Sequence, residues 1–488
     1  MTTLTSSLQE TTPAVAPANP GVWTAWEKFL FRVFSIFVLL LIIPFDSVWL
    51  GKLFQVKTFF AFLNTLTGYR ANFYEVHTES GKWGLESYAT WAIAFGIALI
   101  LGGVWTFFAR NSKRTQYNEL YYWVRVIVRY RIAIGIIAFG FLKFFPMQMP
   151  TPSLSNLDTN FGDYNTYKIY WQVVGVSIWY EVVLGIVEIL GGILLLFRQT
   201  AAIGAVIIAG VLYNIAHANI AYDGGVHVYS SLFVLFSLFV LVQYIPNLWK
   251  LLIKGEDVKP NLYYPVFNKR WKRVSYYWAK YIIIFTFTLL FGILRYDVHY
   301  HVGQLKEPIT PGLKNAAGYY NVSEFKLNGQ DVPYSPLDSV RWQSVVFEKW
   351  STLIYKVNKA FPISLANGGP NPKDVDRNYE LAGIAGGRRF LFYNAKNGKL
   401  ILQDKDRPSV DEDGSPFKKA AAVKPESKKG KGKGKHHKDD KKLIWAYTRP
   451  TPNRIIISGV NEHKDSLYVV LDKVNKNYPI RINRANIH

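Results

Sequence analysis

The sequence predicts a membrane protein in which an all-α bundle of about seven transmembrane helices precedes a C-terminal antiparallel β-sandwich or barrel. Seven apolar segments reach or approach the length that crosses a bilayer. After residue 305, short runs with alternating apolar and polar residues replace them, which is typical of strands. Half of the 488 residues are hydrophobic and 16% are aromatic, more than one soluble core needs.

The apolar segments give the expected boundaries of the spans. Prolines at positions 44, 146 and 246 lie at segment ends, where a helix tolerates them. The segment 52–68 between the first two spans fits either an interfacial helix or a packed loop helix. The expected spans are residues 24–45, 86–109, 121–146, 171–197, 200–221, 226–247 and 276–296.

The distribution of Lys and Arg predicts the orientation in the membrane. Residues 110–131 and 247–280 are rich in basic side chains, whereas 147–170 contains only Lys168 and 218–226 contains none. Because basic loops stay in the cytoplasm, the N-terminus is expected inside and the chain after about residue 297 outside. This places the protein in a bacterial inner membrane with a periplasmic C-terminal domain.

The C-terminal domain shows hairpin signals and one low-complexity stretch. Strand-like runs occur at 319–329, 339–350, 388–402, 444–450, 453–460 and 466–474. The pairs Asn328-Gly329 and Asn397-Gly398 are typical of two-residue hairpin turns. Residues 405–442 are rich in Lys and Gly, which predicts a disordered loop, with docking to anionic lipid or polysaccharide as the alternative.

Composition excludes several classes of site. The chain has no cysteine, so disulfides, thiolate nucleophiles and cysteine-ligated metals or clusters are excluded in this subunit. The net charge of +23 is explained by cytoplasmic loops and the Lys-rich stretch, without nucleic-acid binding. His299 and His301 do not complete a metal site with any other ligand, and His436-His437 fall in the Lys-rich stretch, so no metal is predicted.

Residues 120–250 resemble the DoxX-like family of membrane proteins, in particular its large Bacteroidetes members. The resemblance rests on the pattern R-x-R-x-A-x-G-x-x-x-x-G-x-x-K at 129–143, FPMQ at 145–148, WQVVG at 171–175, and the segments 185–200 and 214–223. It implies a four-helix core, and some family members are linked to a thiosulfate:quinone oxidoreductase. Family members often carry a Val-Lys pair after the Tyr-Asp; here the stretch reads GGVH, so His227 replaces a basic residue.

Together these observations divide the chain into parts. They are a disordered tail (1–21), an N-terminal transmembrane pair with an interfacial segment (22–119), the DoxX-like core (120–250), a cytoplasmic loop with the last transmembrane helix (251–304) and the extracytoplasmic β-domain (305–488).

Ionisable residues inside the predicted spans mark the candidate site, because charge within hydrocarbon is unfavourable without a partner. Depth estimates along the helices place Arg131 level with Glu188, which predicts a structural ion pair between neighbouring helices. The functional alternative is a pocket in which Glu181, Glu188 and His217 exchange protons with a bound quinone. The pocket would be lined by Lys143, Trp179, Asn214, Asp223 and His227, with Trp171 and Tyr213 as further aromatic walls.

Three functions remain open at this point. The protein could be the membrane subunit or scaffold of an envelope or respiratory complex. If it is an enzyme, we expect a quinone-linked oxidoreductase subunit. It could be a non-catalytic membrane anchor whose outer β-domain binds a partner protein or an envelope component. Small-solute transport is the third, resting only on the intramembrane charges. The expected partners are the lipid bilayer and other membrane or periplasmic subunits, and quinone is the only cofactor considered.

Overall fold

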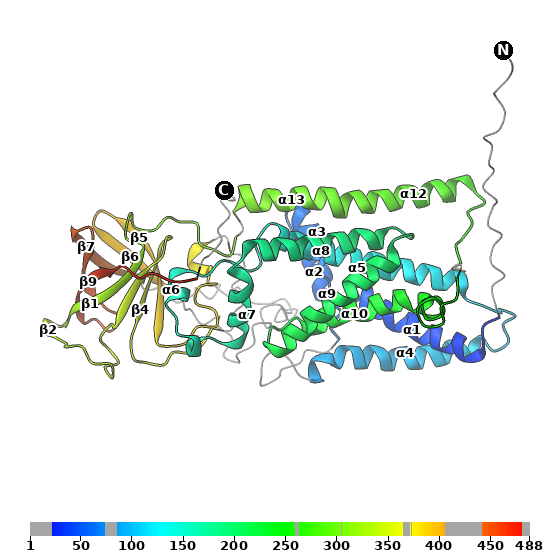
Figure 1. Cartoon of the computed structure of the whole chain (residues 1–488), viewed down its shortest axis with the longest axis horizontal. Helices are drawn as coiled ribbons and strands as arrows, with labels where there is room; N and C mark the ends of the chain where they lie inside the picture. The colour runs from blue at the N-terminus through cyan, green and yellow to red at the C-terminus, as the bar shows by residue number, and fades with distance from the viewer. Residues whose placement is uncertain are drawn as a thin grey trace, which may run out of the picture.

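The computed structural model describes residues 22–73, 85–258, 263–303, 305–364, 371, 373–405 and 442–480. The predicted N-terminal tail and nearly all of the Lys-rich stretch, with His436-His437, lie outside these residues. Helices occupy one end of the molecule and a β-barrel the other, with the short helices α6 and α7 between them (Figure 1).

The helical region begins at residue 25 and ends near residue 302. Within the described residues, five helices or continuous helical stretches are long and apolar enough to cross a membrane: Ala89–Phe108, Ile178–Leu196, Ala201–Ala221, His227–Ile253 and Arg270–Val302. The α-helices are α1 (Ala25–Ile42), α2 (Ser47–Gln55), α3 (Phe59–Thr67), α4 (Ala89–Phe108), α5 (Asn118–Phe144), α6 (Leu154–Leu157), α7 (Thr166–Gly175), α8 (Ile178–Leu196), α9 (Ala201–Ala221), α10 (His227–Leu241), α11 (Ile245–Ile253), α12 (Arg270–Phe285) and α13 (Phe291–Asp297).

The predicted first and third spans form helices α1 and α5, but both carry several charged side chains, and the count of seven spans stays a prediction. The predicted span 171–197 is wrong as one helix. The chain breaks between Gly175 and Ile178, which leaves α7 as a separate short helix. At this break a side chain on Gly175 would lie 2.4 Å from the carbonyl oxygen of Pro150, so the preceding loop packs directly on the backbone.

Glycines set the closest helix contact, between α5 and α8. A Cβ on Gly185 would lie 2.5 Å from the Phe144 nitrogen and 2.6 Å from the Gly140 carbonyl oxygen, so the two backbones touch. Small residues permit this approach in membrane bundles. Nearby, Leu63 of α3 packs with Ala138 and with Phe291 of α13. This contact supports the alternative in which the segment 52–68 is a loop helix packed on the bundle.

The C-terminal domain is a closed eight-stranded antiparallel barrel, so the barrel alternative is correct and the sandwich is not. Strands follow in chain order, β1 pairs with β9 to close the ring, and the two-residue β2 extends β1 as a hairpin. The strands are β1 (Gly318–Leu327), β2 (Gln330–Asp331), β3 (Ser344–Phe347), β4 (Thr352–Lys356), β5 (Arg388–Lys396), β6 (Lys399–Asp404), β7 (Leu443–Thr451), β8 (Arg454–Val460) and β9 (Ser466–Val474).

Both predicted hairpin turns are confirmed. Asn328 and Gly329 have φ of 52° and 78°, and Asn397 and Gly398 have φ of 52° and 72°. These left-handed values are those of type I′ turns, which match the twist of the flanking strands. Inside the barrel, Trp342 stacks on Tyr355 with ring centroids 4.2 Å apart, and Trp445 is 2% exposed. Side chains therefore fill the interior.

Candidate functional site

The crossing of α5 and α8 buries an ion pair inside the helical region. Lys143 Nζ lies 2.8 Å from each carboxylate oxygen of Glu188, and the two side chains are 6% and 1% exposed. The Gly140–Gly185 contact places Glu188 at the level of Gly140. Because a helical side chain points back toward the N-terminus, Lys143 reaches that level from one turn further along α5.

The predicted Arg131–Glu188 pair is therefore wrong. Arg131 lies nine residues before Gly140, which is about 13 Å along the helix. Its guanidinium instead donates to the carbonyl oxygens of Tyr69 at 2.5 Å and Thr67 at 3.3 Å, and to the Tyr229 hydroxyl at 3.2 Å. Arg131 thus joins the end of α3 to α10. The predicted depths assumed that α5 and α8 begin and end at the same level. The contact between Gly140 and Gly185 sets a different alignment of the two helices.

Glu181 lies in the first turn of α8 and binds the loop that follows α5. Its Oε1 accepts hydrogen bonds from the backbone nitrogens of Gln148 and Met149, both at 3.1 Å, and the side chain is fully buried. A carboxylate in the first turn is also favoured by the helix dipole. Glu181 therefore fixes the loop that leaves α5 against the start of α8.

The remaining predicted site residues do not assemble into the expected pocket. Asn214 and His217 are exposed on the outer face of α9, where His217 stacks on Tyr213 with ring centroids 6.4 Å apart. Trp179 is 57% exposed. Asp223 occupies the turn after α9 with φ of 52°, and His227 is buried 2.9 Å from Ser87 Oγ. Of the predicted set, the structure brings together Lys143, Glu181 and Glu188.

Two buried lysines that the sequence reasoning did not select lie between the helices and the barrel. Lys168 of α7 donates to the carbonyl oxygen of Tyr379, and Lys306 Nζ lies 4.2 Å from the centre of the Trp171 ring. Both line a small cavity of about 20 Å³. The sequence gave no reason to select these lysines, because their neighbours are distant in the chain. Tyr379, for example, is 211 positions from Lys168.

Burial dominates the titration of both lysines. It lowers the pKa of Lys168 to about 7; Glu380 opposes the shift and Lys306 adds to it. Burial also lowers the pKa of Lys306 to about 7, opposed by the charge of Glu181. The junction thus holds two amines that can lose their protons near neutral pH.

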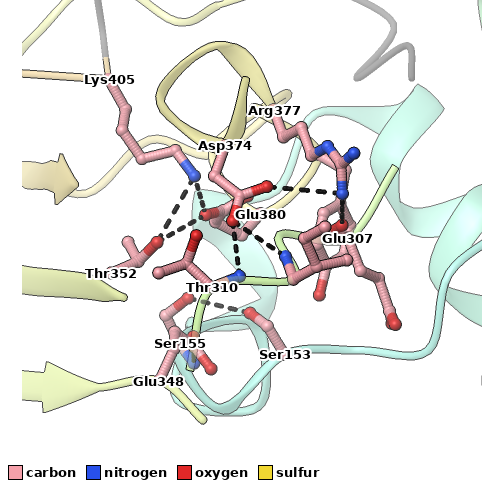
Figure 2. A network of polar contacts seen from close by, with 12 residues as sticks. Ser153, Ser155, Glu307, Thr310, Glu348, Thr352, Asp374, Arg377, Glu380 and Lys405 are labelled. Atoms are coloured by element: carbon pink, nitrogen blue, oxygen red, sulfur yellow. Dashed lines mark hydrogen bonds and ion pairs between the residues drawn. The ribbon is translucent and has the colours of Figure 1, made fainter. Parts of the chain in front are cut away.

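A network of buried polar contacts fixes the barrel to the segments on either side of it (Figure 2). Glu348 accepts hydrogen bonds from the backbone nitrogens of Leu154 at 3.0 Å and Ser155 at 2.8 Å. Asn156 Nδ2 donates to the Glu380 carbonyl oxygen at 2.8 Å. These contacts connect α6, which follows α5, to the barrel more than 190 residues later.

The same network holds the linker that leads from α13 into β1. Asp374 accepts from the backbone nitrogens of Ile309 at 2.9 Å and Thr310 at 2.6 Å. Arg377 donates to the carbonyl oxygens of Glu307 and Gly303, both at 2.7 Å. Beside it, Glu380 forms a fully buried ion pair with Lys405 and accepts from Thr352 Oγ1 at 3.2 Å. The barrel is therefore attached at both the α6 loop and the linker.

Across the described ranges, no group of three His, Cys, Asp or Glu side chains could hold a metal ion. The arrangement at the junction is suited to holding two parts of a protein in one orientation and to proton exchange by the two lysines.

Comparison with known proteins adds one partial match. No protein-family model matches the chain, and no solved structure matches it. It is similar to the uncharacterized protein YwoB of Bacillus subtilis (strain 168), with 39% identity over 75 residues, which make up 15% of this chain and 49% of YwoB. The chain thus matches about half the length of this curated relative, whose name gives no activity. Membership of the DoxX-like family stays a prediction.

Proposed function

We propose that the protein is a membrane scaffold whose β-barrel binds a partner protein or an envelope component outside the cytoplasmic membrane. The observation that carries the proposal is the buried network at the junction. Glu348, Asp374 and Arg377 together make six hydrogen bonds to backbone groups of the α6 loop and the linker. Such an attachment presents the barrel to a partner in one orientation.

The packed interior of the barrel supports a binding role for its outer surface. Trp342, Phe347 and Trp445 belong to one buried cluster that fills the ring. Barrels that carry a small ligand inside keep a cavity there. The proposed periplasmic location rests on the distribution of Lys and Arg in the loops of the helical region.

The test compares the full chain with a version that ends at residue 304. Both are purified from the native membrane under identical conditions, and co-purifying proteins are quantified by mass spectrometry. We expect the truncated version to insert at the same level and to lose a stable partner. Identical partners on both versions would contradict the scaffold role.

A quinone-linked membrane subunit is the second candidate, and the specific observation is the Lys143–Glu188 pair beside Glu181. Three ionisable groups within one helix crossing are unfavourable in a membrane and usually serve a function. The proton-handling role is then proposed for Glu181 and Glu188 only, because His217 is exposed on α9.

Mass spectrometry of protein purified in mild detergent tests this candidate. Near-stoichiometric quinone in the wild type that is lost in Glu188→Gln would support it. The absence of quinone from both samples would leave Lys143–Glu188 as a structural pair.

A further inference from the structure

The barrel carries an open cavity of about 490 Å³ that the scaffold role does not use. It lies where β1 begins and β9 ends, and Leu154 of α6 forms one wall, so it faces the helical region. A volume of this size accommodates a small organic molecule. The side chains that give it its chemistry are Tyr319, Asn453, Lys473, Asn475, Lys476 and Tyr478.

One side of the cavity is an organised aromatic and cationic wall. Lys476 Nζ lies 4.3 Å from the centre of the Tyr319 ring and 5.8 Å from that of Tyr478. Its position is fixed by an ion pair with Asp158, which Arg388 also contacts at 3.0 Å. Two cations therefore share this carboxylate, which leaves the wall positive.

A second carboxylate near the cavity, Glu348, is held by hydrogen bonds within the protein. Glu348 lies close enough to Tyr478 for its charge to oppose ionisation of that tyrosine. Both of its oxygens accept hydrogen bonds from backbone nitrogens, those of Leu154 and Ser155. Asp158 is thus paired with cations, and Glu348 is hydrogen-bonded to backbone nitrogens.

Lys473 also lines the cavity, Arg449 lies near it, and both side chains contact backbone carbonyl oxygens. Lys473 Nζ lies 3.4 Å from the carbonyl oxygen of Asn315. Arg449 donates to the carbonyl oxygens of Lys314, Asn315 and Pro452. Among the described residues, no carboxylate forms an ion pair with either side chain. Burial and the charge of Arg449 lower the pKa of Lys473, consistent with excess positive charge.

We propose that this cavity binds an organic phosphate, with Lys473 and Lys476 holding the phosphate group and Tyr319 and Tyr478 contacting the organic part. Lysine ammonium groups are common phosphate ligands in proteins. A bare anion would leave most of 490 Å³ unfilled, so the ligand carries further atoms. The phosphate belongs either to the headgroup of an anionic phospholipid or to a soluble phosphate ester.

Binding to the full-length protein in non-ionic detergent tests the proposal. The probes are dihexanoyl phosphatidylglycerol, glycerol 3-phosphate and inorganic phosphate, with Kd measured by microscale thermophoresis. We expect Lys473→Gln to weaken binding of an organic phosphate about tenfold, the loss expected for one charge-assisted hydrogen bond. Lys473→Arg should retain binding because the charge remains.

Lys326→Gln is the matched control. It removes the same charge from the same barrel, but Lys326 lines a different cavity, near β2, and pairs with Glu324 at 2.9 Å. Its Kd should equal that of the wild type. An unchanged circular dichroism melting curve of Lys473→Gln would show that the variant is folded.

The outcomes separate the sources of the phosphate. Tighter binding of phosphatidylglycerol assigns a lipid headgroup, and tighter binding of glycerol 3-phosphate assigns a soluble ester. The proposal is overturned if neither organic probe binds, if Lys473→Gln binds as tightly as the wild type, or if inorganic phosphate binds as tightly as the organic probes.

Discussion

Four buried carboxylates of this protein each have a partner group. Glu188 is paired with Lys143, and Glu380 with Lys405. Glu181 and Glu348 accept backbone N–H groups instead. An unpaired ion in such a place would destabilise the fold by several kcal/mol, roughly 3–5 kcal/mol when one partner of a buried pair is removed. Lys168 and Lys306 also have neighbours that stabilise their charged forms, but burial outweighs them.

Lys168 and Lys306 should make the stability of the folded protein depend on pH. Each has a folded pKa of about 7 against an ordinary value of 10.5. Between those values the unfolded chain binds more protons, so the free energy of unfolding rises with pH, by at most about 1.4 kcal/mol per pH unit for each lysine. Below pH 7 both states are protonated, and the unfavourable contribution is fully present.

The expected observation is a melting temperature of the barrel that increases from pH 7 to pH 9, followed by near-ultraviolet circular dichroism in detergent. Lys168→Met combined with Lys306→Met should flatten this profile. A wild-type profile as flat as that of the double variant would show that the folded lysines titrate at ordinary values.

At the scale of elements, the contact between α5 and α8 should be sensitive to a change of side-chain size. Gly185→Ala should destabilise the helical region by about 1–3 kcal/mol, because the added methyl group meets backbone atoms that cannot move independently. Thermal unfolding in detergent, monitored by far-ultraviolet circular dichroism, measures the change. Gly210→Ala on α9 is the control: nothing lies within 4 Å of its Cβ position, so stability should be unchanged or slightly higher. Equal effects of the two substitutions would contradict this account.

Elements were predictable where their signal is local. The Asn-Gly turns need only two adjacent residues that adopt a left-handed backbone conformation, and both turns have it. The fourth strand, Thr352–Lys356, was missed because it is five residues long and directly follows a predicted run. The break at Gly175 was also missed, since the loop that packs there is set by tertiary contact.

Sites were less predictable because their partners are distant in sequence. Glu181 and Glu188 could be selected from the rarity of carboxylates in apolar helices. Their partners depend on helix register, which no residue of α8 encodes alone. Lys168 and Lys306 are unremarkable as sequence, and only the docking of the barrel buries them.

At the scale of the whole molecule, the helical region and the barrel should behave as one body. The absence of cysteine permits spin labels at Ala221→Cys and Lys396→Cys, both at exposed positions, one on each part. Pulsed electron paramagnetic resonance should give a narrow distance distribution in the otherwise unchanged protein.

Glu348→Ala should broaden that distribution. It leaves the backbone nitrogens of Leu154 and Ser155 buried without their acceptor, at about 1–3 kcal/mol for each group. Glu324→Ala, on an exposed part of β1, should leave the distribution narrow. A broad distribution in the parent would argue against a barrel held in one orientation.

The pairing of β1 with β9 also has a consequence for biogenesis. The ring closes only when residues near 320 meet residues near 470, so the barrel cannot close until the chain has been synthesised beyond residue 470. Contacts of such long sequence separation form slowly. Until β9 arrives, β1 and β8 remain open edges able to pair with other chains. The α6 loop is synthesised before the barrel, so its backbone nitrogens are available to Glu348 as soon as β3 forms.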